Sequence, residues 1–208
     1  MKIRNDFVSN SSSSSFIVIN KNGHYEHIDS SDTIVLPQYE HGCYYFGWQT
    51  EKYFDIWSKL NWCSLLCIEQ LKLERQYPSG IASSGESIYY HDLTFEKMQA
   101  ALIRVCKKRL NIDIKLNISE KNYADDTEYD DMDLAYIDHQ SGMWESPENA
   151  RMFESDQMLY DFLANSNSYI DNSNDNEGRI YDPYEYGVGY YARPKDYSGK
   201  TENDKIVE

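Results

Sequence analysis

Short apolar runs in the first fifty residues predict strands. Residues 15–20 carry the apolar run Phe16-Ile17-Val18-Ile19 between serines and the turn-forming cluster Asn20-Lys21-Asn22-Gly23, which predicts a buried strand. Residues 24–28 are expected to return as its hairpin partner. Residues 33–36, which end at Pro37, and residues 43–46 are two further predicted strands.

Helical periodicity begins near Thr50, which is expected to cap a helix that ends at Tyr77-Pro78-Ser79-Gly80. Its apolar stripe consists of Tyr53, Trp57, Leu60, Ser64, Cys67 and Leu71. Because about 25 residues is long for one helix, we expect a break near Asn61.

The clearest amphipathic helix starts after the capping residue Thr94. Its apolar face consists of Phe95, Met98, Leu102, Val105, Cys106 and Leu110. Its C-terminal end carries four cations, Arg104, Lys107, Lys108 and Arg109. Cations at this end interact favourably with the helix dipole, which explains the group without a phosphate ligand.

The remaining elements are shorter. Alternation over residues 112–118 predicts a strand with one solvated face, and an acidic loop (119–133) precedes a strand at 134–138. Ser146-Pro147 starts one short helix and Ser155 caps another. Residues 169–170 and 179–181 flank an Asn/Asp-rich stretch and predict a hairpin with a long loop.

These patterns predict an α+β fold with a mostly antiparallel sheet and three to four helices. We expect a single domain over residues 1–193 and a flexible tail over 194–208. Apolar residues make up 40% of the chain and charged residues 26%, which is typical of a globular protein.

No apolar run reaches the roughly 20 residues of a membrane span, and the start lacks the apolar centre of a secretion signal. A cytoplasmic protein without membrane association is therefore expected, and the four cysteines, with no CxxC pair, are expected to be reduced structural thiols.

The net charge of −15 is confined to one part of the sequence. Residues 1–118 hold 13 acidic and 13 basic side chains, whereas residues 119–208 hold 22 acidic and seven basic ones. Such an excess repels nucleic acid and attracts basic surfaces. We therefore expect a basic protein surface as partner and no direct nucleic-acid binding.

Two segments carry a resemblance to a protein family. The first runs Phe7-Val8-Ser9-Asn10, then Ser11 to Ser15, then Phe16-Ile17-Val18, and the second is Phe162-Leu163-Ala164-Asn165-Ser166-Asn167-Ser168-Tyr169-Ile170 followed by Asn174-Asp175-Asn176. Both are similar to segments of uncharacterised proteins from tailed phages and some bacteria. Ser173 stands where that family often has a glycine. The resemblance implies a phage or mobile-element setting, and hence the cytoplasm of a host cell, but no activity and no catalytic residues.

Two polar stretches are candidate ligand loops. Ser12, Ser13 and Ser14 could contact a ligand, although a serine run that precedes a strand is also typical of a flexible entry to it. Asp171, Asn174, Asp175 and Asn176 belong to a stretch whose carboxylates have partial calcium-loop spacing. Asn176 occupies the position of the required glycine, which favours a polar hairpin loop over calcium.

Other metal and catalytic patterns are weak. His24, His27, His41 and Cys43 lack zinc-ligand spacing, so we predict no metal site and no cofactor. Cys63 and Cys67 share a helix face with no histidine near them in sequence. The sequence contains no recognisable catalytic motif, which favours a protein that is not an enzyme and leaves the activity uncertain.

The strongest local signal is an acidic cluster without Lys or Arg. Its members are Asp125, Asp126, Glu128, Asp130, Asp131, Asp133 and Asp138, interleaved with Tyr123, Tyr129 and Tyr136. It is either a solvated loop or a surface that imitates the phosphates of nucleic acid. The second reading predicts a non-catalytic phage accessory protein that binds and blocks a host nucleic-acid-handling or defence protein. The alternatives are a small metal-dependent enzyme acting on nucleotides, with Asp171 and Asp175 as ligands, and a phage structural or assembly protein.

Overall fold

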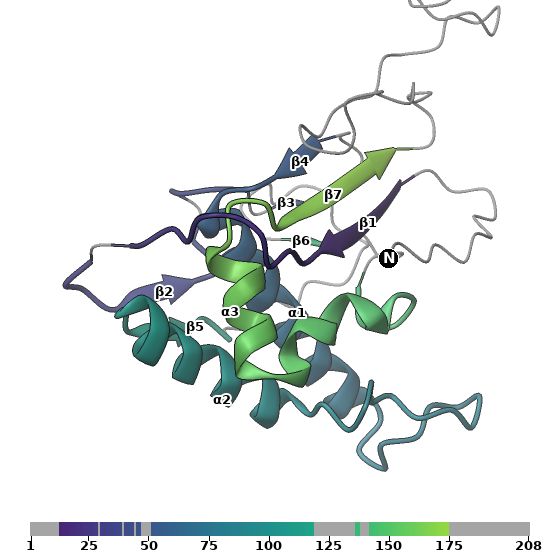
Figure 1. Ribbon diagram of the computed structural model, residues 1–208. Coiled ribbons are helices and arrows are strands. Elements are labelled where there is room, and N and C mark those ends of the chain that lie inside the picture. Colours follow the sequence, from purple (N-terminus) through teal and green to yellow (C-terminus); the bar gives the residue numbers. More distant parts are fainter. Residues whose placement is uncertain are drawn as a thin grey trace, which may run out of the picture.

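The computed structural model describes residues 13–28, 30–38, 40–43, 45–46, 51–118, 136–137 and 142–174. Within these ranges three small sheets lie beside a group of helices (Figure 1). The prediction of an α+β fold is confirmed. The described part of the chain contains three α-helices and one 3₁₀ helix, in agreement with the expected three to four helices.

Helix α1 (Ile56–Gln76) is the central element. Asp55 caps it by accepting a hydrogen bond from the backbone N–H of Ser58 at 2.8 Å. The predicted start near Thr50 is wrong, because Glu51–Tyr53 pairs with another strand as β4. The predicted break near Asn61 is also wrong: the helix is continuous there, and its buried residues surround its axis, as in a helix enclosed by other elements.

Helix α2 (Phe95–Val105) forms as the sequence predicts. Thr94 accepts a hydrogen bond from the N–H of Lys97, and Met98, Leu102 and Val105 are buried, while Phe95 is half-buried. The helix continues into a π-helical turn, η1 (Cys106–Leu110), which ends at Asn111 with φ of 57°. Asparagine tolerates this left-handed conformation, so it terminates the helix as a glycine would.

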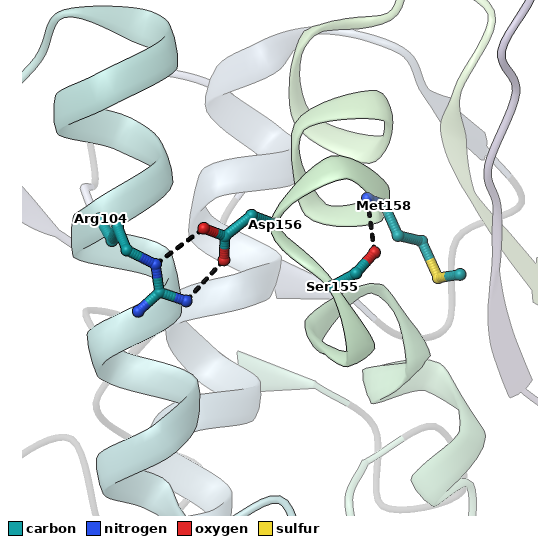
Figure 2. A network of polar contacts seen from close by, with 4 residues as sticks. All are labelled: Arg104, Ser155, Asp156 and Met158. Atoms are coloured by element: carbon teal, nitrogen blue, oxygen red, sulfur yellow. Dashed lines mark hydrogen bonds and ion pairs between the residues drawn. The ribbon is translucent and has the colours of Figure 1, made fainter.

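The 3₁₀ helix η3 (Pro147–Glu154) and helix α3 (Asp156–Ala164) confirm the two predicted short helices. Ser155 lies between them and accepts a hydrogen bond from the N–H of Met158 at 3.1 Å (Figure 2). Helices α1, α2 and α3 contact one another, with α3 next to both of the others (Figure 1).

The largest sheet has the order β1-β7-β4 and is antiparallel, with β1 at Ser13–Val18 and β7 at Tyr169–Asn174. Two parallel pairs accompany it. They are β2 (Ile34–Leu36) with β5 (Ile114–Leu116), and β3 (Tyr45–Phe46) with β6 (Tyr136–Ile137). Every strand predicted within the described residues is present except the one at residues 24–28, and β5 has the expected single solvated face.

Both predicted hairpins differ from the observed pairing. Residues 24–28 do not pair with β1; Tyr25 instead forms a single bridge with Asn165. The second predicted hairpin joined residues 169–170 to residues 179–181, which lie outside the described residues. Ile170 pairs with Ile17 of β1 on one side and with Tyr53 of β4 on the other, so both edges of β7 are already paired at this position. The central strand of the sheet therefore comes late in the sequence and its neighbours come early.

One hydrophobic core joins these elements. Ile17, Ile170 and Tyr53 face it from the large sheet, and the helices on one side of that sheet supply most of the remainder (Figure 1). Trp62 and Phe46 are fully buried and meet edge to face, with ring centroids 4.9 Å apart. Among the described helices, none is long and apolar enough to cross a membrane. The proposed division at residues 193 and 194 stays a prediction.

Candidate functional site

The pairing of β1 with β7 brings the two candidate ligand stretches together. Ser13 lies opposite Asn174, Ser14 opposite Ser173, and Ser15 opposite Asn172. Ser13, Ser14, Asp171 and Asn174 are thus strand residues within one antiparallel pair, while Ser12, Asp175 and Asn176 lie outside the described residues. The two segments that carry the family resemblance are consequently neighbours in space, although about 150 residues separate them in sequence.

Buried polar side chains connect this strand pair to the helices. Ser15 and Asn172 are buried, and the Ser15 hydroxyl donates to Asn172 Oδ1 at 2.5 Å. The buried amide of Asn149, on η3, donates to the carbonyl of Ser15 at 2.9 Å. Polar groups buried in this way must be hydrogen-bonded to avoid a desolvation penalty, so these contacts fix η3 against the sheet.

An ion pair occupies the opposite face of the sheet. Lys52 of β4 lies opposite Asp171 of β7, with Nζ 3.5 Å from Oδ2, and the two side chains are 9% and 5% exposed. The Lys52 ammonium also lies 5.0 Å from the ring centroid of Tyr169. Asp171 is therefore a strand residue with a cation beside it, which differs from the loop position implied by the partial calcium-loop spacing.

A second buried cation lies where α1, α3 and β7 meet. Lys59 is fully buried, and its Nζ donates to the carbonyls of Asn165 at 3.1 Å and Ser168 at 3.3 Å. Both carbonyls lie beyond the end of α3. That of Asn165 also accepts from the Ser168 N–H at 3.0 Å, and the ammonium supplies a further donor to this turn. Burial lowers the pKa of Lys59 to about 8, against the opposing fields of Glu26 and Asp55.

Residues 22–26 also hydrogen-bond to the loop between α3 and β7. Ser166 N–H donates to the carbonyl of His24 and Glu26 N–H to that of Ala164, while the Asn167 amide donates to the carbonyl of Asn22. A Cβ atom on Gly23 would lie 2.4 Å from Asn165 Oδ1. This close approach explains the glycine, and the contacts give the Asn/Ser-rich segment a structural role.

Asn61 organises the loop before β3. Its amide nitrogen donates to the carbonyls of Gln38, His41 and Cys43 at 3.0–3.1 Å, and its Oδ1 accepts from the Gln38 N–H at 2.7 Å. Ser58 accepts from the Cys43 N–H at 2.7 Å. Two polar residues on the buried face of α1 therefore satisfy the backbone of a loop that lies against them.

The predicted metal and nucleophile candidates do not form a catalytic group. His24 contacts Ser166, His41 packs on the Trp57 ring, and Cys43 donates to the Tyr45 carbonyl. Within the described ranges, no three His, Cys, Asp or Glu side chains gather closely enough to hold a metal ion. Cys63, Cys67 and Cys106 are buried free thiols, and burial raises the pKa of each, that of Cys106 to about 12. These thiols stay protonated at neutral pH and are poor nucleophiles.

The basic end of α2 is engaged within the fold. Arg104 donates to both carboxylate oxygens of Asp156 at 2.8 and 2.5 Å (Figure 2). This contact lowers the pKa of Asp156 and raises that of Arg104. Lys107 pairs with Asp113, and the Arg109 guanidinium lies 4.2 Å from the ring centroid of Tyr160.

The acidic cluster falls almost wholly outside the described residues. Asp125, Asp126, Glu128, Tyr129, Asp130, Asp131, Asp133 and Asp138 all lie in the undescribed ranges. The described chain reaches this segment from β5 and meets it again at β6, whose Ile137 is buried. The interpretation of the cluster as a binding surface stays a prediction.

Sequence reasoning missed Lys52, Lys59 and Asn149 as members of buried polar groups. A lysine in an otherwise apolar helical stretch was the available signal for Lys59, whereas Lys52 and Asn149 depend on long-range pairing that no local pattern reveals. No family model, curated protein or solved structure matches this chain.

Proposed function

We propose that this chain is a non-catalytic binding protein that blocks a basic, nucleic-acid-handling or defence protein of a host cell through its acidic C-terminal part. The contact surface is the acidic cluster of residues 125–138, which imitates the phosphate array of nucleic acid. The observation that carries the proposal is the segregation of charge, with the whole net charge of −15 in residues 119–208. The two segments that resemble phage proteins, parts of which pair with each other as β1 and β7, support a setting in which a host protein is the target.

The contacts of several basic side chains support the same proposal. Arg104, Lys107 and Lys52 pair with Asp156, Asp113 and Asp171, respectively, and Lys59 is enclosed in the core. Each of these four cations thus has a partner among the described residues. Their positive charges therefore interact with groups within the fold. This favours a cation of another protein as the partner of the acidic cluster.

Capture from a bacterial lysate on the immobilised protein tests the proposal. We expect nucleic-acid-binding proteins to be retained at low salt, released as salt rises, and displaced by short DNA duplexes that compete for the same basic groove. Neutralising the cluster in the variant Asp125→Asn, Asp126→Asn, Asp130→Asn, Asp131→Asn should abolish this retention.

A matched control carries the same change in charge elsewhere. Asp32→Asn, Glu40→Gln, Glu86→Gln and Glu96→Gln alter four exposed carboxylates within the neutral part of the chain. This control should retain the same proteins as the wild type. Equal retention by the wild type and the cluster variant, or retention that DNA does not displace, would contradict the proposal.

A further inference from the structure

An exposed aromatic pair lies beside the start of η3. Trp144 is 50% exposed, the largest exposure among the large apolar side chains of the described residues. Its indole stacks on the ring of Tyr77 with centroids 5.7 Å apart and an interplanar angle of 16°. One side of the indole is thus covered by Tyr77, while half of the residue stays accessible to solvent.

The turn that carries Trp144 is held in place on both sides. Met143 is buried and its N–H donates to Glu69 Oε2 at 2.8 Å, while the Ser146 N–H donates to the carbonyl of Gly142 at 2.9 Å. A Cβ on Gly142 would lie 2.4 Å from the Glu69 carboxylate, so glycine permits this close approach.

Tyr77, the other ring, is fixed at the C-terminal cap of α1, where its N–H donates to the carbonyl of Leu73 at 2.8 Å. The aromatic pair is therefore presented in a fixed geometry, which lowers the entropy cost of binding.

Charge around the pair favours a cationic ligand. Glu145, which follows Trp144 directly, and Glu148, four residues after Trp144, are both exposed. Lys72 and Arg75 of α1 have interactions of their own within the chain. A phosphate-bearing ligand would be repelled by these carboxylates, whereas a guanidinium is both planar, so that it stacks on an indole, and positive.

We propose that the Trp144–Tyr77 pair receives an arginine side chain of the basic partner protein. This inference rests on the proposed function and adds an aromatic contact to the attraction that the acidic cluster exerts on the partner. Tryptophan, tyrosine and arginine are the residues that most often dominate binding energy at protein interfaces. The acidic cluster would attract any cation, and the aromatic pair would distinguish arginine from lysine.

Two labelled peptides of equal charge separate these contributions, one of five Arg-Gly repeats and one of five Lys-Gly repeats, with binding followed by fluorescence anisotropy at low salt. The wild type should bind the arginine peptide about two- to fivefold more tightly than the lysine peptide. Trp144→Leu should reduce this ratio to about one while leaving the affinity for the lysine peptide within about twofold.

Two variants complete the design. Val35→Thr changes a side chain of similar exposure, 48%, on β2 and should keep the wild-type ratio. The four-carboxylate cluster variant should bind both peptides more weakly and keep the ratio. Thermal melts of each variant confirm that it is folded.

The outcomes separate the two proposals. Equal affinities of the wild type for both peptides would overturn the arginine contact and leave the acidic surface standing. Failure of the wild type to bind either peptide would overturn the proposed function together with the inference. Binding of a single-stranded oligothymidylate that Trp144→Leu abolishes would assign the pair to base stacking instead and would also overturn the inference.

Discussion

Replacing Lys59 by methionine gives the sharpest test of the buried polar contacts. Burial lowers the pKa of Lys59 from 10.5 to about 8. In the unfolded chain the ammonium keeps its proton up to about pH 10.5, so between pH 8 and 10.5 unfolding takes up one proton at this group. The contribution of Lys59 to the free energy of unfolding therefore rises with pH through that window.

The two pKa values set the size of this effect. Their difference corresponds to about 3 kcal/mol, the amount by which the charged form is disfavoured in the folded protein at pH 7. Methionine would remove that cost but leave the Ser168 carbonyl without its ammonium donor, at about 1–3 kcal/mol, while the Asn165 carbonyl keeps its hydrogen bond from the Ser168 N–H. At pH 7 the free energies of unfolding of the wild type and the variant should therefore differ by only a few kcal/mol. As pH rises to 10.5, the wild type should gain about 3 kcal/mol relative to it.

Urea unfolding followed by circular dichroism from pH 7 to 10.5, under reducing conditions, measures this difference. The buried thiols of Cys63, Cys67 and Cys106 act in the opposite direction, because their folded-state pKa values are raised and stability falls once the unfolded thiols ionise. They are present in both proteins and cancel in the difference. Lys115→Met, at an exposed position on β5, is the matched control and should show no such rise. A difference between wild type and Lys59→Met that stays flat over this window would refute the reasoning.

Further substitutions test the remaining parts of the fold. Leu102→Ala should lower the free energy of unfolding by about 2–5 kcal/mol, because Leu102 is fully buried on α2; a loss under 1 kcal/mol in urea would contradict its core position. Asn61→Ala should cost at least about 2 kcal/mol and increase amide exchange at residues 38–43, whose backbone it binds; unchanged exchange there would speak against that role. Ser155→Ala should cost about 0.5–2 kcal/mol in thermal melts, and Ser155→Asp should restore most of it as an alternative cap. Arg104→Ala should cost less than about 1 kcal/mol, since its ion pair with Asp156 is largely exposed, and a larger loss in denaturant would show that estimate to be wrong.

Local sequence signals predicted the starts of α2 and α3 correctly. Thr94 and Ser155 cap α2 and α3 as expected because a side-chain oxygen before an apolar periodic stretch satisfies the free N–H groups there. The same reasoning failed at Thr50, because Glu51–Tyr53 pairs with β7 and α1 is capped by Asp55 instead. The length of the predicted helix suggested a break near Asn61, yet the helix is continuous there and the Asn61 amide is paired with backbone from residues 38–43. Tertiary contacts decided both positions.

The candidate site was predictable only in part. The serine run and the segment that begins at Asp171 stand out separately in the sequence, each for its polar composition. That they form one strand pair follows from register over a long sequence separation, which a single sequence does not encode in any local pattern. Neither the Lys52–Asp171 ion pair nor the contact of Asn149 with Ser15 could be inferred without that pairing.

The order of strands in the large sheet has a consequence for synthesis on the ribosome. Among the described strands, β7 is the neighbour of both β1 and β4, so these two early strands cannot complete their pairing until β7 has emerged. Tyr53, the last residue of β4, and Tyr169, the first residue of β7, are 116 positions apart, an interval of about 6–23 s at ordinary rates of translation. During that interval the nascent chain can form α1 and α2, while β1 and β4 remain without a template. A message truncated before residue 169 would release a chain that carries most of the core helices together with two unpaired strands, and such a product is a natural substrate for chaperones and proteases.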